Sequence, residues 1–393
     1  MKPTTEDLIR WADADAQARP TRLDALRERM AAVDVDAYFG VRRENTRYLT
    51  GFELGEGEEK VAGNSGQFLV SRDEVVVFAD SRYTFAAAEQ CAGARVERVY
   101  NNLLSRWDEV LGSLGRVRRL AVEAAFVSHA TWLRLAEAAP DVELVPVEGW
   151  VETLRQIKEP SEIERIAAAC AVADAALERI RPLIRPGVPE KELALALEWE
   201  MRTNGAEALA FDVAVLSGPR AALPHGSPGS RTIAAGEVLL FDFGAQVAGY
   251  RSDMTRTLFV GEPTPRDLAI YELVARAQQT AIDALDEAVR TGVIPSGRVV
   301  DSIARDVIRD AGHGEHYGHG LGHGIGLATH EMPGLGVSAP ETPLPSPTVF
   351  SVEPGTYLDG ETGVRIEDLV LFDAASKRLE RLTNFTRQVT VVG

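Results

Sequence analysis

The stretch LLFDFGAQVAGYRSDMTRT, residues 239–257, places one aspartate inside an apolar, strand-like run and a second aspartate eleven residues later. An unpaired carboxylate is costly to bury, so Asp242 should meet a cation or strong hydrogen-bond donors. If residues 244–249 include the turn of a hairpin, Asp242 and Asp253 can face each other on adjacent antiparallel strands. Thr255 would share the face of Asp253. The stretch therefore predicts a metal-binding hairpin; a structural aspartate that binds backbone amides is the alternative.

Three more potential metal ligands follow the hairpin. His323 lies in HGLGHGIGLATHE, residues 319–331, where alternating glycines let the backbone approach closely. Glu353 ends a strand-like run at a Pro-Gly turn, and Glu367 follows Arg365, which could orient a ligating carboxylate. Carboxylates with one imidazole suit a pair of divalent ions such as Mn²⁺, Co²⁺ or Zn²⁺. The alternatives are a flexible glycine loop with incidental histidines and an ordinary surface ion pair at Arg365.

Length, charge and cysteine content limit the class of protein. At 393 residues the chain exceeds what one core usually supports, so two domains of roughly 150–250 residues are expected. The net charge of −17 argues against nucleic-acid and membrane partners. The two cysteines form no CxxC pair, which argues against a disulfide scaffold or a thiolate zinc site. Because no secretory signal or long apolar stretch is present, we expect a cytoplasmic protein.

The first part of the chain alternates helical and strand-like patterns. A helical apolar pattern at 21–33 is followed by strand-like runs at 37–39, 67–70 and 74–78. Strands that alternate with helices indicate an α/β domain. We assign this domain to residues 1–154.

A second domain is expected over residues 155–393. Near its start, Ser161 and Glu164 have the spacing of a capping box and precede a long amphipathic pattern. A weak internal repeat follows, in which a helix opens at Pro189 and another opens at Pro295, each stopping at a glycine 16 or 17 residues later. Ligand-bearing strands come after each helix. The pattern predicts a duplicated α+β unit with metals between its halves.

Together these segments resemble the pita-bread metallopeptidases that cleave Xaa-Pro bonds, the prolidase and aminopeptidase P family. NTRYLTGF at 45–52 and DSRY at 80–83 resemble the creatinase-like N-terminal domain, and IKEPSEI at 157–163 resembles its junction to the catalytic domain. The resemblance implies an α+β fold, with a pita-bread catalytic domain over 155–393 preceded by a smaller α/β creatinase-like domain over 1–154.

The resemblance also implies how the ligands are shared between two divalent ions. Asp242 would hold one ion, Asp253 and Glu367 would bridge both, and His323 and Glu353 would complete the other. Mn²⁺ is the expected metal, with Co²⁺ or Zn²⁺ as alternatives. A homodimer is expected from the same resemblance.

Catalytic roles follow from the resemblance and from the chemistry of hydrolysis. Metal ions lower the pKa of bound water, and Glu353 would accept its proton. His330 and His225 match the two active-site histidines that are not ligands; they would stabilise the oxyanion or bring a proton to the prolyl nitrogen. His319 would be structural or would support a ligand, and Arg365 would orient a ligand. The expected substrates are proline-containing dipeptides or short peptides.

The residue at position 334 leaves the length of the substrate peptide undecided. Many dipeptidases of this family have an arginine at the position of Gly334, where it binds the C-terminal carboxylate of the substrate. A Xaa-Pro dipeptidase is the first interpretation, and an aminopeptidase P that acts on longer peptides is the alternative. A non-catalytic pita-bread binding protein is a third reading, although such proteins typically lack the full ligand set.

Overall fold

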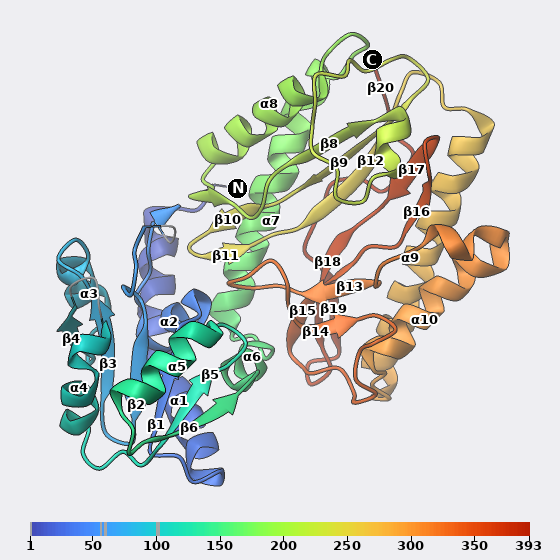
Figure 1. Cartoon of the computed structure of the whole chain (residues 1–393). Helices are drawn as coiled ribbons and strands as arrows, with labels where there is room; N and C mark the ends of the chain where they lie inside the picture. Colours follow the sequence, from blue (N-terminus) through green and yellow to red (C-terminus); the bar gives the residue numbers. More distant parts are fainter. Residues whose placement is uncertain (1, 56, 59–60, 100–102) are drawn as a thin grey trace. The chain divides into compact units, whose positions relative to one another are not determined.

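The computed structural model describes residues 2–55, 57–58, 61–99 and 103–393 (Figure 1). They form two compact units. One unit is Ile9–Leu154, and the other is Arg155–Gly393 together with the N-terminal residues up to Leu8. The assignment of residues 1–154 and 155–393 to two domains remains a prediction. In the structure, the residues before Ile9 group with the second compact unit and not with the first.

The first unit contains a mixed six-stranded sheet in the order β4-β3-β2-β1-β5-β6. Its strands are β1 Ala37–Gly40, β2 Phe68–Ser71, β3 Val75–Ala79, β4 Arg95–Arg98, β5 Arg119–Glu123 and β6 Glu143–Val147. Every residue of β1, β2 and β3 is buried, which is typical of a sheet covered on both faces. The three predicted strand-like runs are therefore confirmed.

Helices complete the first unit, although the first four residues of α1 and the last residue of α6 group with the second unit. They are α1 Thr5–Ala32, α2 Arg43–Thr50, α3 Thr84–Gln90, α4 Trp107–Ser113, α5 His129–Ala138 and α6 Trp150–Arg155. The helical pattern at 21–33 corresponds to the last part of α1, which begins earlier than the pattern indicated. Trp107 of α4 packs edge-on against Phe39 of β1, with ring centroids 5.0 Å apart. The core thus lies between the sheet and its helices.

The second unit begins with a helix whose start differs from the prediction. Helix α7 spans Pro160–Ile180, and its capping box is formed by Glu159 and Glu162. The prediction of Ser161 and Glu164 was wrong because proline favours the first helical position, where its missing N–H costs nothing. Ser161 therefore lies inside the first turn.

Two helix pairs flank the sheets of the second unit (Figure 1). The pairs are α7 with α8 (Glu190–Thr203), and α9 (Pro265–Thr291) with α10 (Gly297–Ile308). Helix α8 packs on the sheet that contains β8, and α9 packs on the sheet that contains β18 and β19. Among the helices of the described residues, none combines the length and the apolar character that a bilayer span requires.

Two larger sheets carry the polar residues of interest. The first has the order β20-β12-β9-β8, and the second has the order β14-β13-β15-β18-β19. Their strands are β8 Ala214–Ser217, β9 Val238–Phe243, β12 Met254–Val260, β13 Gly322–Gly324, β14 Glu331–Leu335, β15 Thr348–Val352, β18 Asp368–Asp373, β19 Arg378–Arg381 and β20 Val391–Val392. Smaller sheets are formed by β7 Ala208–Leu209, β10 Ala245–Val247 and β11 Tyr250–Arg251, and by β16 Gly355–Leu358 and β17 Thr362–Arg365.

Candidate metal centre

The predicted hairpin is present. Strands β9 and β12 pair antiparallel with Asp242 opposite Thr255, and Asp253 directly precedes β12. The chain reverses at Ala248 and Gly249, whose φ angles are 45° and 81°. Positive φ at both central residues is the geometry of a tight turn that matches the twist of the flanking strands. The hairpin therefore brings the two aspartates to the same end of the strands.

The glycines beside His323 are required by close backbone contact. A Cβ at Gly322 would lie 1.9 Å from the carbonyl oxygen of Ser351, and a Cβ at Gly324 would lie 2.2 Å from that of Met332. These distances are far below van der Waals contact, so only glycine fits at either position. The two glycines let β13 pass between β14 and β15, and this fixes where the imidazole of His323 points.

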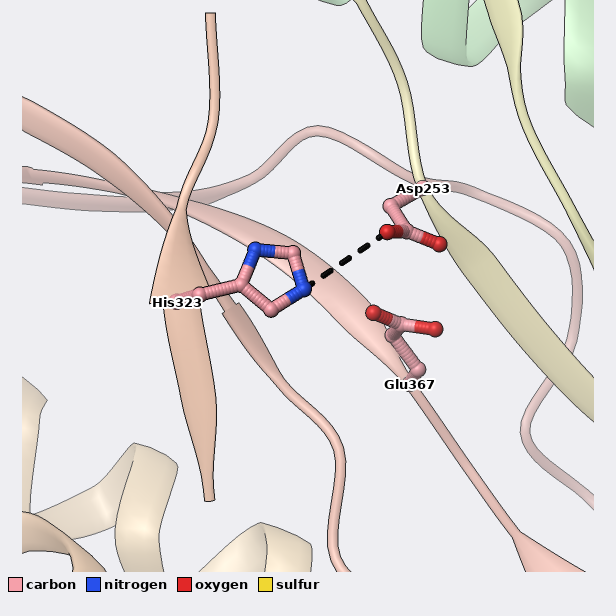
Figure 2. A group of neighbouring side chains, drawn as sticks. All are labelled: Asp253, His323 and Glu367. Carbon is pink, nitrogen blue, oxygen red and sulfur yellow. Dashed lines mark ion pairs between the residues drawn. The ribbon is translucent and has the colours of Figure 1, made fainter. Parts of the chain in front are cut away.

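Asp253, His323 and Glu367 converge from three separate segments (Figure 2). Each offers one ligand atom, and these atoms all lie within 4.8 Å of one another. Nε2 of His323 is 3.7 Å from Oδ2 of Asp253 and 3.2 Å from Oε1 of Glu353. Figure 2 shows the imidazole directed toward the two carboxylates. His323 and three of the other four predicted ligands thus lie close together.

The fifth, Asp242, is held by Arg365. Nη2 of Arg365 lies 2.5 Å from Oδ2 of Asp242, and its Nε donates to Oγ1 of Thr255 at 2.9 Å. Thr255 in turn donates to Oε2 of Glu367 at 2.8 Å. Arg365 was expected to orient a ligating carboxylate, and the predicted ligand with which it forms a direct ion pair is Asp242; Thr255 lies between Arg365 and Glu367.

The histidines outside the cluster fall into two groups. His330 is exposed, and its ring centroid is 4.2 Å from that of His323. His225 is also exposed, close enough that its charge acts on the pKa of both Asp242 and His330. His319 instead bonds through Nε2 to the hydroxyl of Tyr357, at 2.8 Å.

Two supporting residues were missed by the sequence analysis. The hydroxyl of Tyr357 accepts a hydrogen bond from Arg365 at 3.0 Å, and so links that guanidinium to His319. The hydroxyl of Ser351 donates to Oε1 of Glu353 at 2.8 Å and accepts from the amide of His323. Ser351 lies two residues before Glu353 on an extended segment, so the shared face could have indicated it.

Burial and mutual repulsion raise the pKa values of two of the clustered carboxylates, Asp253 and Glu367. Burial is the largest cause for Asp253, and the charge of Glu367 adds to it; the pKa rises well above the usual range. The pKa of Glu367 is raised in the same direction by burial and by the charges of Glu353 and Asp242. Burial alone would also raise the pKa of Glu353, but the hydrogen bond with His323 and the charges of His323, Arg365 and His319 together outweigh burial and lower this pKa to about 2.

The donor set fits divalent metal ions. Oε1 of Glu367 is buried and has no hydrogen-bond partner within the described part of the chain, although buried polar atoms nearly always have one. Several carboxylates gathered at such a position repel one another, and a divalent cation offsets that cost. Carboxylate oxygens with one imidazole are ligands that Mn²⁺, Co²⁺ and Zn²⁺ accept.

Comparison of the sequence with known protein families shows the family to which the chain belongs. Residues 164–374, which contain all five candidate ligands, match metallopeptidase family M24, and residues 22–157 match the creatinase/prolidase N-terminal domain. The chain belongs to metallopeptidase family M24. Family M24 is a family of dinuclear metal peptidases with the pita-bread fold, in agreement with the fold expected from the sequence.

Three M24 relatives illustrate the similarity. A Xaa-Pro dipeptidase of Pyrococcus furiosus is 34% identical over 92% of this chain and 97% of its own length. The structure of a Xaa-Pro dipeptidase from Bacillus anthracis is 34% identical, with a TM-score of 0.85 over 95% of this chain and 100% of that one. An X-Pro aminopeptidase from Thermotoga maritima is 33% identical, with a TM-score of 0.82 over 94% and 99%. Dipeptidase and aminopeptidase structures are thus similar to this chain to nearly the same degree.

Proposed function

We propose that this M24 chain hydrolyses Xaa-Pro peptide bonds and that Xaa-Pro dipeptides are its first substrates. The observation that carries the proposal is the convergence of Asp253, His323 and Glu367 within 4.8 Å, in a chain of this family. Glu353 lies against the same imidazole, and Asp242 is bound to Arg365. This donor set supports a metal-dependent hydrolase more strongly than a binding protein that lacks it.

The five side chains Asp242, Asp253, His323, Glu353 and Glu367 would hold two divalent ions, with Mn²⁺ as the first choice. When bound, the ions would supply the positive charge that activates water and polarises the scissile carbonyl. Arg365, supported by Tyr357 and indirectly by His319, would keep Asp242 in position. Thr255 would do the same for Glu367.

Glu353 is proposed as the group that accepts a proton from the attacking water. Ser351 donates to one of its oxygens and thereby fixes the orientation of the carboxylate. A general base must reach the proton that it removes, and a carboxylate at the edge of the cluster satisfies that requirement. Its position beside His323 supports the assignment.

His330 and His225 are proposed to act on the substrate and not on the ions. Both are exposed near the cluster, so a bound peptide can reach them. The nitrogen of a Xaa-Pro bond belongs to a tertiary amide and carries no N–H, so it must gain a proton as it departs. An imidazole at this position would deliver that proton or donate to the oxyanion.

A second candidate function, cleavage of longer peptides by an aminopeptidase P activity, is favoured by Gly334. Gly334 pairs with His323 across the β13–β14 ladder. Apart from Pro333 and Leu335, its neighbours along the chain, no described residue has a heavy atom within 4 Å of where a Cβ at Gly334 would stand. Open space beside the cluster leaves room for a peptide that extends beyond proline.

A comparison of peptide lengths tests the proposal. We expect the Mn²⁺-loaded protein to hydrolyse Ala-Pro with a higher kcat/KM than Ala-Pro-Ala, and to leave Ala-Ala intact. A preference for the tripeptide would replace the dipeptidase assignment with the aminopeptidase. Equal cleavage of Ala-Ala would overturn Xaa-Pro specificity itself.

We also propose a cytoplasmic homodimer without nucleic-acid or membrane partners. The net charge of −17 disfavours binding to polyanions. Light scattering on the purified protein should give about twice the chain mass of 42.6 kDa. A mass equal to that of one chain would contradict the dimer.

A further inference from the structure

A polar pocket of about 490 Å³ lies between α9 and the segment that follows β19. The residues that line it include Gln278, Gln279, Arg381, Asn384, Thr386 and Arg387. Its volume falls within the roughly 300–1,000 Å³ of small-molecule sites. Such sites are mostly apolar, whereas this one is lined largely by amide, hydroxyl and guanidinium groups. The pocket therefore suits a small hydrophilic ligand.

The pocket is separate from the metal centre. Glu367 and Asp368 are consecutive residues on an extended segment, and consecutive side chains there point to opposite sides. Glu367 joins the ligand cluster, while Asp368 accepts a hydrogen bond from Gln278, a pocket residue. A ligand in the pocket would consequently lie across the backbone from the ions and would not touch them.

Positive charge is in excess around Asp368. This buried carboxylate lies 2.7 Å from Arg256, 3.5 Å from Arg387 and 4.0 Å from Arg381. A second carboxylate, Asp174, accepts the backbone amides of residues 384 and 385. Around the buried Asp368 and Asp174, three arginines face two aspartates, an excess of one positive charge in a chain whose net charge is −17. The exposed Asp283 accepts a hydrogen bond from Gln279 and lies outside this buried group.

The surroundings of Arg387 show the same excess. Burial lowers its pKa, and although Asp368 acts in the opposite direction, the charges of Arg381 and Arg256 add to the lowering. An anion near Arg387 would relieve this repulsion between cations. Guanidinium groups present planar, forked donors that match carboxylate and phosphate oxygens two at a time.

We propose that this pocket binds a small oxyanion, a phosphate or a carboxylate, between the guanidinium groups of Arg381 and Arg387. Gln279, Asn384 and Thr386 add polar groups around the bound anion. The anion supplies the negative charge that Asp368 and Asp174 together do not provide for three arginines.

Occupancy of the pocket is connected to the ligand-bearing segments through shared hydrogen bonds. Arg256 donates to the carbonyl of Thr386 in the pocket wall, to that of the neighbouring Phe385, and also to the carbonyl of Glu367. Gln278 donates to the carbonyls of Val352 and Ile366, which immediately precede two predicted ligands. An anion that orders the wall should therefore stabilise the second unit as a whole.

Calorimetric titration of the full-length, Mn²⁺-loaded protein tests the proposal. Inorganic phosphate and succinate are titrated in separate arms, at an ionic strength held constant with chloride. We expect saturable binding of one anion per chain in at least one arm. Tighter phosphate binding assigns the site to phosphate-type oxyanions, and tighter succinate binding assigns it to carboxylates. Either result supports an anion site in the pocket, provided that the arginine variants weaken the binding of that anion.

Arg381→Gln and Arg387→Gln should each raise the Kd at least tenfold, because charge-assisted hydrogen bonds are lost. Arg290→Gln is the matched control, since it removes one exposed positive charge from α9 away from the pocket and should leave the Kd unchanged. If Arg387→Gln does not fold, Arg381→Gln still tests the proposal. The Arg381 side chain is 35% exposed, and its ion pair with Asp368 is long, at 4.0 Å, so its loss should be tolerated. Phosphate bound at the metal centre would survive both substitutions, and that result, or no saturable binding in either arm, overturns the proposal.

Discussion

A buried carboxylate, Glu331, joins the start of the second unit to the loop that carries His330. Its side chain is only 4% exposed and forms ion pairs with Arg155 and with Lys158, the latter at 3.2 Å. It also accepts the amide of Ala328 at 2.7 Å. Glu331→Gln keeps the shape of the side chain but removes the negative charge that both buried cations contact.

The magnitude follows from the pKa of Glu331. Burial would raise this pKa, but the charges of Arg155 and Lys158 and the accepted hydrogen bonds lower it to about 2. Set against about 4.3 for a solvated glutamate, proton linkage gives about 3 kcal/mol of stability at pH 7. That figure agrees with the cost of about 3–5 kcal/mol for breaking a buried ion pair.

The sign of the pH dependence can be worked out. Because the folded-state pKa is depressed, the stabilisation is complete above about pH 4.3 and is lost as the pH falls through about 2. The free energy of unfolding of Glu331→Gln should therefore be about 3 kcal/mol below that of the wild type at pH 7. Near pH 3 the difference should shrink to about half.

Urea unfolding followed by circular dichroism at pH 7 and pH 3 measures both values. Glu341→Gln is the matched control, since this glutamate is 81% exposed and its surface pair with Arg298 should contribute less than about 1 kcal/mol. The reasoning is refuted if Glu331→Gln unfolds like the control at pH 7, or if its deficit is the same size at pH 3.

Three further predictions concern the centre itself. Glu353→Gln should reduce kcat on Ala-Pro by at least about a hundredfold while leaving the circular dichroism spectrum unchanged, since a proton acceptor contributes about 10²–10⁴; near-normal kcat with metal present contradicts the assigned role. Arg365→Met should weaken Mn²⁺ binding about 10–100-fold in a calorimetric titration, because Asp242 loses its 2.5 Å contact; an unchanged Kd would remove Arg365 from the centre. Gly334→Arg should raise the ratio of Ala-Pro to Ala-Pro-Ala turnover, since the added guanidinium can bind a C-terminal carboxylate from an open position; a constant ratio would place length selection elsewhere.

Local sequence patterns predicted much of the fold and of the centre. The apolar runs of β1, β2 and β3 and the hairpin that carries Asp242 and Asp253 follow from short-range periodicity and turn residues. The glycines around His323 indicated a close backbone approach, which the contacts with Ser351 and Met332 explain. These features depend on residues that are close together along the chain, so local sequence patterns are sufficient to predict them.

Contacts between distant residues could not be predicted in the same way. Arg365 pairs with Asp242 across 123 positions, and Arg155 meets Glu331 across 176 positions, so spacing contains no signal for either. Tyr357 was missed for a related reason, because its hydroxyl acts through Arg365 and not on a ligand directly. The cap of α7 was misplaced by a local competition, in which Pro160 set the start of the helix ahead of Ser161.

The central claim is that this M24 chain holds two divalent ions with Asp242, Asp253, His323, Glu353 and Glu367. Metal analysis of protein purified without chelator and equilibrated with Mn²⁺ tests it most directly. The wild-type protein should hold about two ions per chain, and Asp253→Asn should hold fewer. No bound metal even after Mn²⁺ is added would contradict it and would favour a non-catalytic binding protein.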